Sequence, residues 1–179
     1  MYSSGLRVVI INGKPEVGKT TFEKLAKDIL GEAFCESRST VDKVKEIAKY
    51  IGWDGVKDLK SRKLLSDLKD ICTEYNDMPV TDITKWLDKW DEDLRYYGVG
   101  SQPHVFFIDD REPEHIQRLK EKLNAITVLI RRPGDEDIET SNHADEEVFN
   151  YNYDWTIYND GDIEDFRNKT QAFLNWIFS

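Results

Sequence analysis

The residues whose chemistry can be named first lie near the start of the chain, where positions 13–20 read Gly-Lys-Pro-Glu-Val-Gly-Lys-Thr. This segment fits the pattern G-x-x-x-x-G-K-[ST] at every fixed position. In such a loop the glycines let backbone N–H groups turn toward an anion, the lysine reaches the β- and γ-phosphates, and the hydroxyl ligates Mg²⁺. We therefore expect ATP and Mg²⁺ to bind here, with Lys19 as a catalytic residue and Thr20 as a metal ligand. The expected ATP contacts are Gly13, Lys14, Pro15, Glu16, Val17, Gly18, Lys19, Thr20 and Thr21.

The segments that flank this loop have the patterns that a phosphate site needs. Residues 7–12 form a short apolar run, as expected for a buried parallel strand. Residues 21–30 have helical spacing, with one side formed by Phe22, Leu25, Ala26 and Ile29. A strand, a glycine loop and a helix N-terminus in this order favour an anion site. The alternative is a glycine turn between strand and helix that binds nothing.

The composition restricts the class of protein and its partners. The chain has 179 residues and a formal net charge of −10, so we expect one soluble domain that neither wraps nucleic acid nor lies on an anionic membrane. No apolar run approaches the roughly 20 residues that span a bilayer, and residues 1–7 have no signal-peptide pattern. Cys35 and Cys72 lack metal-ligand spacing, which predicts reduced thiols in a cytoplasmic protein. A monomer and a homodimer both remain open.

Hydrophobic periodicity divides the chain into strands and helices that alternate at both ends, with a helical region between them. The predicted strands cover residues 7–12, 33–37, 104–109, 125–130 and 153–158. The predicted helices cover residues 21–30, 41–51, 61–75, 81 or 82 to about 97, 112–123 and 163–178. In the helix 61–75, the residues expected to face inward are Leu64, Leu65, Leu68, Ile71 and Cys72.

Five strands joined by helical crossovers predict an α/β fold of the P-loop NTPase class, with a doubly wound parallel sheet flanked by helices. The region from about 39 to 100 is too long for one crossover helix, so we expect a helical insertion there. It should emerge at the carboxyl edge of the sheet, where ligands of such folds lie. The expected organisation is a single domain over residues 1–179, with its core at about 1–38 and 101–179. The polar region at about 132–148 is expected to be a short lid.

Asp109 ends the apolar run 104–109 and is the second expected metal ligand. In P-loop enzymes such an aspartate holds Mg²⁺, usually through its water shell. Asp110 is the second choice for this role, and a helix N-cap or a strand-end turn is the alternative for both. No metal or catalytic spacing connects the histidines, which are expected to be structural or exposed: His104, His115 and His143.

Several arginines follow predicted strands and can clamp phosphate groups. Arg111 follows the strand 104–109, and Arg131 and Arg132 follow the strand 125–130. Phosphoryl transfer between two anionic substrates needs such cations, and the fork of an arginine matches two phosphate oxygens. We expect Arg111, Arg131 and Arg132 to be catalytic. Arg62 lies in the helical insertion, where a solvated face of lysines and arginines is the alternative.

The stretch around the glycine loop, residues 10–21, resembles the P-loop nucleoside monophosphate kinases, most closely their phage and bacterial deoxynucleoside monophosphate kinase and adenylate-kinase-like group. Further similar stretches are residues 39–48, 52–53, 62–69, 74–77, 111–113, 129–133 and 142–145. The resemblance implies a five-stranded parallel core, a helical region that closes on an acceptor monophosphate, and a lid that carries arginines.

The resemblance also implies roles for individual residues. The donor phosphate loop of the family is matched by Gly13, Gly18, Lys19 and Thr20. Arg132 and the polar loop after it lie where the lid is expected, and Arg111 follows the strand that leads to the acceptor site. The acceptor-binding residues expected from the matching stretches are Thr40, Lys45, Arg62 and Arg111.

Two features depart from the family pattern. Thr20 stands where the phage-type relatives often carry aspartate. The expected lid is short and holds more acid than arginine, its acidic residues being Asp135, Glu136, Asp137 and Glu139.

Together these observations predict a Mg²⁺-dependent phosphotransferase that moves the γ-phosphoryl group of ATP to a nucleoside or deoxynucleoside monophosphate. Metazoan phosphomevalonate kinases have a similar loop, so a phosphomevalonate-type small-molecule kinase is one alternative. Another is an ATP-driven switch of the partitioning type, because Lys14 gives the loop its second lysine, although Pro15 and Glu16 replace the two glycines of those loops. A third is a nucleotide-binding protein without turnover, which the acidic lid motivates.

Overall fold

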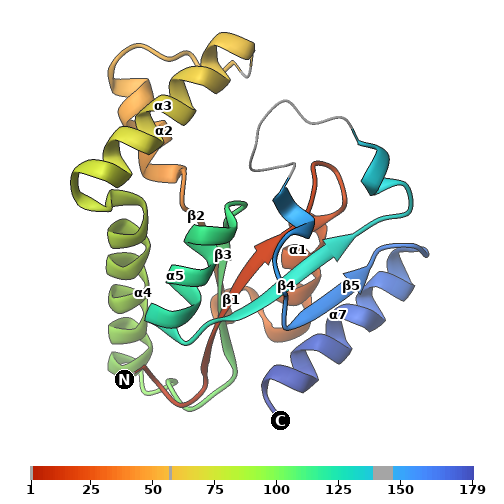
Figure 1. Cartoon of the computed structure of the whole chain (residues 1–179). Coiled ribbons are helices and arrows are strands. Elements are labelled where there is room, and N and C mark those ends of the chain that lie inside the picture. Colours follow the sequence, from red (N-terminus) through yellow and green to blue (C-terminus); the bar gives the residue numbers. More distant parts are fainter. Residues whose placement is uncertain (1, 57, 139–146) are drawn as a thin grey trace.

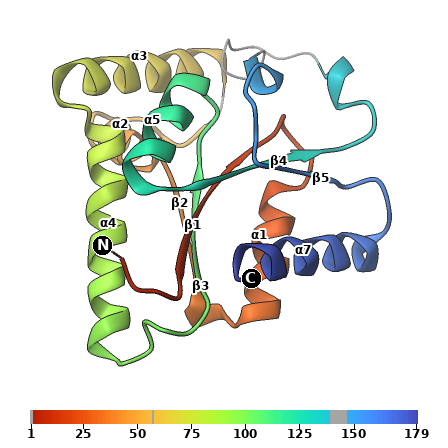
Figure 2. The ribbon, with the colours of Figure 1, turned by 60° about the horizontal axis from the view of Figure 1, so that its bottom comes forward.

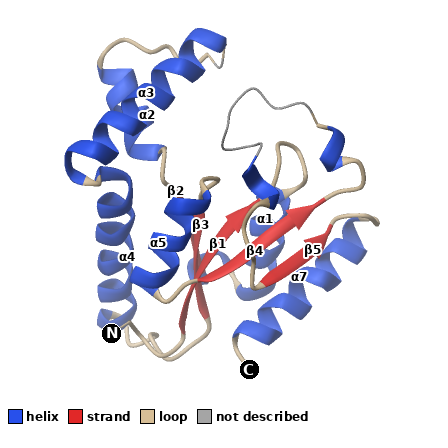
Figure 3. Cartoon of the chain, in the orientation of Figure 1, coloured by secondary structure: helices blue, strands red, loops and turns tan. Residues whose placement is uncertain are grey.

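The strands form one parallel sheet in the order β2-β3-β1-β4-β5. The computed structural model describes residues 2–56, 58–138 and 147–179. Helices cover both faces of the sheet (Figure 1, Figure 3), which confirms the predicted P-loop NTPase architecture. The strands are β1 (Leu6–Asn12), β2 (Cys35–Ser39), β3 (His104–Asp109), β4 (Ile126–Arg131) and β5 (Trp155–Tyr158).

The helices begin and end close to the predicted positions. They are α1 (Lys19–Leu30), α2 (Asp42–Tyr50), α3 (Leu59–Asn76), α4 (Met78–Tyr96), α5 (Pro113–Leu123) and α7 (Ile163–Ile177). Short 3-10 turns cover Glu32–Phe34, Asp135–Asp137 and Glu147–Phe149. The largest difference is at α4, which begins at Met78 because Pro79 fits the first turn of a helix, where no backbone N–H donor is needed.

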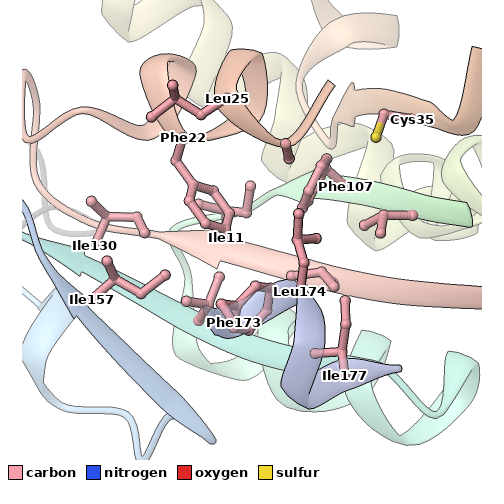
Figure 4. Close-up of a cluster of buried hydrophobic side chains, with 14 of the residues drawn as sticks. Ile11, Phe22, Leu25, Cys35, Phe107, Ile130, Ile157, Phe173, Leu174 and Ile177 are labelled. Carbon is pink, nitrogen blue, oxygen red and sulfur yellow. The ribbon is translucent and has the colours of Figure 1, made fainter. Parts of the chain in front are cut away.

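A hydrophobic core lies on each face of the sheet. Successive side chains of β1 point to opposite faces and so pack alternately in the two cores. Val9 and Ile11 pack with α1 and α7, whereas Val8 and Ile10 pack with α4 and α5. Figure 4 shows the first cluster, in which Phe22 lies close to other buried aromatic rings. Because neither face meets water, the strand appears in the sequence as one continuous apolar run.

The predicted insertion contains two kinds of helix. α4 packs on the sheet through Val80, Ile83 and Leu87. α2 and α3 instead stand beyond the carboxyl ends of the strands, and we name them together the α2–α3 arm (Figure 1, Figure 2). The arm lies on one side of this edge, and residues 132–138, which follow β4, lie on the other (Figure 1).

The predicted inward face of α3 is wrong at Ile71, which is 61% exposed. The buried residues of this helix are instead Ser61 and Lys69. The physical reason is that α3 packs against α2 and α4 and not on the sheet, so it has a narrow contact face. The other residues expected to face inward are half-buried: Leu64, Leu65, Leu68 and Cys72.

Both cysteines are free thiols, Cys35 buried and Cys72 half-buried. Burial raises the pKa of the Cys35 thiol to about 12. Within the described part of the chain, no helix combines the length and the apolar character needed to span a bilayer.

We expect Phe22→Ala to lower the free energy of unfolding by about 3–5 kcal/mol, because removal of a fully buried ring leaves a cavity. The Phe22 ring centroid lies 5.7 Å from that of Phe107 and 5.6 Å from that of Phe173. Urea titration followed by circular dichroism measures the loss. Tyr50, which is 93% exposed, provides the matched control, and Tyr50→Ala should change stability by less than about 0.5 kcal/mol. Equal losses in the two variants would contradict this packing.

Candidate phosphate-binding site

Two glycines shape the loop that joins β1 to α1. Gly13 has a φ angle of 149° and Gly18 one of 110°, which side-chain-bearing residues rarely adopt. A Cβ atom on Gly13 would lie 2.5 Å from the carbonyl oxygen of Ile130, and one on Gly18 would lie 2.6 Å from Nδ2 of Asn159. The loop therefore lies so close to its neighbours that only glycine fits at both positions.

Backbone carbonyls hold both lysines of the loop. Lys19 Nζ donates to the carbonyl oxygens of Gly13 (2.5 Å) and Lys14 (2.8 Å), so its ammonium group lies inside the turn. Lys14 Nζ donates to the carbonyl oxygens of Ile138 (3.1 Å) and Glu136 (3.5 Å). Lys14 thus ties the phosphate loop to the segment that follows β4.

Two asparagine side chains brace the loop, and sequence reasoning missed both. The Gly13 N–H donates to Asn12 Oδ1 at 2.7 Å, and Asn12 Nδ2 lies 2.7 Å from the Tyr153 hydroxyl. Asn159 Nδ2 donates to the Val17 carbonyl at 2.9 Å. A polar residue at the end of a buried strand is a usable signal for Asn12. The role of Asn159 depends on tertiary placement and has no local signal.

The other predicted ATP contacts also lie in or next to this turn. Pro15 and Thr21 are half-buried, Glu16 is exposed with a φ angle of 64°, and Val17 is fully buried. Thr20 is exposed and is the second residue of α1, directly after the loop.

Asp109, at the end of β3, is the buried acid of the site. Its Oδ1 is buried, and none of the described groups donates a hydrogen bond to it. Burial raises the pKa of the Asp109 carboxyl, whereas the charges of Lys19 and Arg111 lower it, so these three groups lie within electrostatic reach of one another. A buried carboxylate oxygen with remaining acceptor capacity suits metal-bound water, the role predicted for Asp109.

Asp110, the second choice for the metal, is engaged elsewhere. Its Oδ1 accepts hydrogen bonds from the backbone N–H groups of Arg111 (2.7 Å) and Glu112 (3.2 Å). Its side chain is 0% exposed, and Lys69 Nζ lies 3.9 Å from the same oxygen. Asp110 therefore forms the turn between β3 and α5, which is the structural alternative that its position allowed.

Glu23 is a second acid near Asp109 that sequence reasoning missed. It lies one helical turn after Lys19 in α1. Burial and, to a smaller extent, the charge of Asp109 raise the pKa of the Glu23 carboxyl to about 7, against the opposing charges of Lys27 and Lys19. Its spacing of four residues from Lys19 is a usable signal, because residues i and i+4 share a helix face.

The arginines that follow β4 have different surroundings. Arg131 Nη2 donates to Asp135 Oδ1 (2.7 Å) and Glu136 Oε1 (2.6 Å), and these bonds raise the pKa of the guanidinium group. The guanidinium carbon also lies 4.4 Å from the centre of the Phe149 ring. Arg132 is exposed; its backbone N–H donates to Asp135 Oδ2 at 3.2 Å, and its carbonyl accepts from the Asp135 N–H at 3.0 Å. Arg131 thus fastens the segment after β4, whereas the Arg132 side chain points into solvent.

The predicted acceptor residues Thr40, Lys45 and Arg62 come from the segment between β2 and the end of α3, and two of them act on Asp109. Thr40 is buried, and its N–H and hydroxyl both donate to the Asp109 carbonyl, at 3.2 and 3.4 Å. Lys45 Nζ lies 3.0 Å from Asp42 Oδ1, and its charge lowers the pKa of Asp109. Arg62 is exposed on α3. Thr40 and Lys45 are therefore brought to the loop, and Arg62 belongs to the arm.

The structure describes the expected lid over residues 132–138 and 147–148. Glu139, His143 and the rest of the stretch 142–145 lie outside the described residues, as does Lys57 in the arm.

The arrangement can bind a polyphosphate and a divalent cation. The glycine turn holds the Lys19 ammonium group beside Asp109, where anionic oxygens would be neutralised. Among the described residues, no group of three or more His, Cys, Asp and Glu side chains has the geometry of a metal site. Mg²⁺ bound with phosphates takes one or two protein oxygens together with phosphate oxygens and water, and the buried Asp109 Oδ1 has the acceptor capacity for such a role.

Comparison with known proteins identifies the fold. No protein-family model and no curated protein matches the chain. A candidate kinase from Chloroflexus aurantiacus is similar, with 14% identity, a TM-score of 0.51, and coverage of 97% of this chain and 98% of that one. An APS kinase from Mycobacterium tuberculosis aligns over 97% of each chain with 14% identity and a TM-score of 0.47. A dephospho-CoA kinase from Campylobacter jejuni has 16% identity, a TM-score of 0.46, and coverage of 97% of this chain and 98% of that one. The chain therefore shares with the Chloroflexus aurantiacus protein the fold described above, a five-stranded parallel sheet with helices on both faces.

We expect Gly13→Ala to weaken ATP binding by about tenfold or more, because the added Cβ collides with a backbone carbonyl and reshapes the loop. Isothermal titration calorimetry measures the affinity. Gly98→Ala is the control, since Gly98 also has a positive φ (71°) but a Cβ there meets nothing within 4 Å. Unchanged affinity in Gly13→Ala, with the fold intact, would mean that this loop does not enclose phosphate.

Proposed function

We propose that this chain transfers the γ-phosphoryl group of ATP to a nucleoside or deoxynucleoside monophosphate in the presence of Mg²⁺. One observation carries the proposal: Lys19, Asp109 and Arg111 lie within electrostatic reach of one another beside a turn in which Gly13 and Gly18 have no room for a Cβ atom. A loop for phosphates, a buried acid for the cation and a second positive group are the parts that in-line phosphoryl transfer needs.

On the donor side, the backbone N–H groups of residues 16–18 bind phosphate oxygens, and Lys19 stabilises charge on the β- and γ-phosphates. Thr20 and, through water, Asp109 are the residues that would hold Mg²⁺, which neutralises phosphate charge when bound. Arg132 adds a positive charge next to the transferred group, and its solvent-exposed side chain supports this role.

On the acceptor side, Arg111 and the α2–α3 arm position the monophosphate. Thr40 fixes the start of the arm to Asp109 through two hydrogen bonds, and Lys45 and Arg62 add positive charge on the arm. No general base is required, because an acceptor phosphate oxygen is already an anion and mainly needs correct placement.

The contacts of Arg131 favour a supporting role over direct catalysis. Its guanidinium group is paired with Asp135 and Glu136, so contact with a phosphate would require these pairs to exchange. Its removal should therefore loosen the segment after β4.

The contacts of Lys14 weigh against the partitioning-type switch. In that class the second lysine reaches across a dimer, whereas Lys14 is 7% exposed and bonded to carbonyls of its own chain. The phosphomevalonate-type acceptor remains an alternative within the kinase class, and the surplus of acid after β4 keeps a binding protein without turnover as an outcome of the test.

We propose one kinase domain over residues 1–179, with its core at about 1–38 and 101–179, the acceptor-binding insertion at about 39–100, and the lid at about 132–148. The net charge of −10 supports a cytoplasmic enzyme with a small-molecule acceptor and without a nucleic-acid or membrane partner. A monomer and a homodimer are both compatible with this organisation.

The proposal is tested with ATP·Mg²⁺ and a panel of nucleoside monophosphates, deoxynucleoside monophosphates and phosphomevalonate. We expect ADP release to be stimulated by a nucleotide acceptor, and Lys19→Ala to reduce the rate by about 100-fold or more. Lys24→Ala is the control, because Lys24 is an exposed lysine of the same helix and should keep full activity.

Each other result selects a different function. Stimulation by phosphomevalonate alone would move the acceptor to that class. ATP-dependent dimerisation without acceptor-stimulated ADP release would favour the switch. Tight ATP binding without transfer to any acceptor would favour a binding protein.

We expect Arg132→Ala to lower kcat by about 100-fold while KM for either substrate changes less than about threefold, because its charge acts mainly on the transition state. Arg131→Ala is the comparison, and it should reduce thermal stability more than Arg132→Ala does, since it breaks two ion pairs. Steady-state kinetics and thermal melts measure both effects. If Arg132→Ala changed KM alone, Arg132 would contribute to substrate binding and not to stabilisation of the transition state.

A further inference from the structure

Lys69 is a buried lysine on a helix that is mostly exposed. It is 7% exposed, and it belongs to α3 of the arm. Its Nζ lies 2.6 Å from Glu112 Oε1 and 3.9 Å from Asp110 Oδ1. Both carboxylates belong to the turn between β3 and α5, so this ammonium group joins the arm to the core.

The turn that Lys69 contacts contains Arg111. Both the backbone N–H and the backbone carbonyl of Arg111 form hydrogen bonds. The Arg111 N–H donates to Asp110 Oδ1 at 2.7 Å, and its carbonyl accepts from Asn12 Nδ2 at 3.3 Å. The Glu112 N–H donates to the same Asp110 oxygen at 3.2 Å. The backbone position of Arg111 thus depends on where Asp110 lies.

Asp110 cannot hold this position without a positive neighbour, because a carboxylate removed from water is costly unless it is paired. Its side chain is 0% exposed, and its Oδ2 has no hydrogen-bond partner among the described groups. Glu112 brings a second carboxylate, and His115 Nδ1 lies 3.1 Å from Glu112 Oε2. In this cluster Lys69 therefore supplies the positive charge that compensates the carboxylates of Asp110 and Glu112.

Lys69 also fixes the rotation of α3. Arg62 lies seven residues before it, which is close to two helical turns, so the two residues share one side of the helix. Arg62 thus lies on the same side of α3 as the ion pair of Lys69, two turns nearer the start of the helix.

We propose that Lys69 is a positioning residue for phosphoryl transfer: it fixes the arm to the turn 110–112 and so holds Arg111 in the acceptor subsite. The kinetic part of this inference rests on the proposed function. Lys69 itself touches neither substrate, because its ammonium group is buried against Glu112.

The first test is a double-mutant cycle between Lys69→Met and Arg111→Ala. Lys69→Met alone should lower kcat by about tenfold or more while KM for ATP changes less than about twofold, and Lys69→Arg should restore most of kcat. In the Arg111→Ala background, Lys69→Met should change kcat by less than about twofold. Lys122→Met, at an exposed lysine of α5, is the control and should keep full activity. Equal effects of Lys69→Met in both backgrounds would overturn the proposal.

The second test needs no turnover and therefore separates this inference from the proposed function. Hydrogen exchange of the Arg111 and Glu112 amides should be about tenfold faster in Lys69→Met than in the parent, near the parent rate in Lys69→Arg, and unchanged in Lys122→Met. Faster exchange in a chain that phosphorylates no acceptor would keep the positioning role and reject the kinase. Unchanged exchange in Lys69→Met would reject the positioning role whatever the activity.

If Lys69→Met fails to fold, Glu112→Gln replaces it in both tests, because it weakens the same 2.6 Å contact while keeping the shape of the side chain. Glu112→Gln should also lower kcat and speed amide exchange, but by smaller factors than Lys69→Met, because Lys69 still lies beside Asp110 in this variant. Parent-like values in both measurements would overturn the proposal.

Discussion

The parallel pairing of β1 with both β3 and β4 is the constraint on which the site depends. It places the carboxyl ends of three strands at one edge, so the segments that leave them must meet there. The register makes the meeting specific, since Ile11 pairs with Asp109 and Asn12 with Leu129. The phosphate loop, the buried acid and the arginines after β4 are therefore neighbours although they are far apart in the sequence.

Electrostatics then decides what this edge can bind. The chain carries a net charge of −10, so an anion can be held only where local cations outweigh the general field. Lys19 and Arg111 both act on Asp109, and their charge favours its ionised form against the cost of burial. After β4 the positive charge does not prevail in the same way, because the carboxylates of Asp135 and Glu136 offset the charge of Arg131. Lys19 and Arg111 are thus cations whose charges reach the buried acid, whereas the charge of Arg131 is offset by its own acidic partners.

The sequence predicted the features that depend on local backbone geometry. The glycine loop, the strand that ends at Asp109 and the parallel sheet follow from spacing and apolar runs, because local sterics and burial determine them. The ion-pair partners of individual charged side chains were not predictable in this way. Arg131 is the last residue of β4, next to the predicted end of that strand, but whether it pairs with acids four and five residues later depends on how the chain turns at Gly134. Nothing local distinguishes Arg131 from Arg132.

The apolar stripe of α3 failed as a signal for a related reason. Periodicity reports that one side of a helix can be buried, and it does not report what lies opposite. α3 stands beyond the sheet, so Ile71 is exposed and the polar residue Lys69 takes the contact with the core. A lysine within an apolar pattern gives no local sign of burial, because its partners Asp110 and Glu112 come from a distant turn.

Two buried lysines thus connect the phosphate loop and the arm to their surroundings. Among the described lysines, Lys14 and Lys69 are the buried ones, each 7% exposed. Lys14 binds carbonyls after β4 on the donor side, whereas Lys69 binds carboxylates after β3 on the acceptor side. The charge of Lys14 also lowers the pKa of the Asp135 carboxyl, so it is partly offset by the acids after β4. The charge of Lys69 is offset by Glu112 at 2.6 Å. Both connections therefore contribute mainly a fixed geometry.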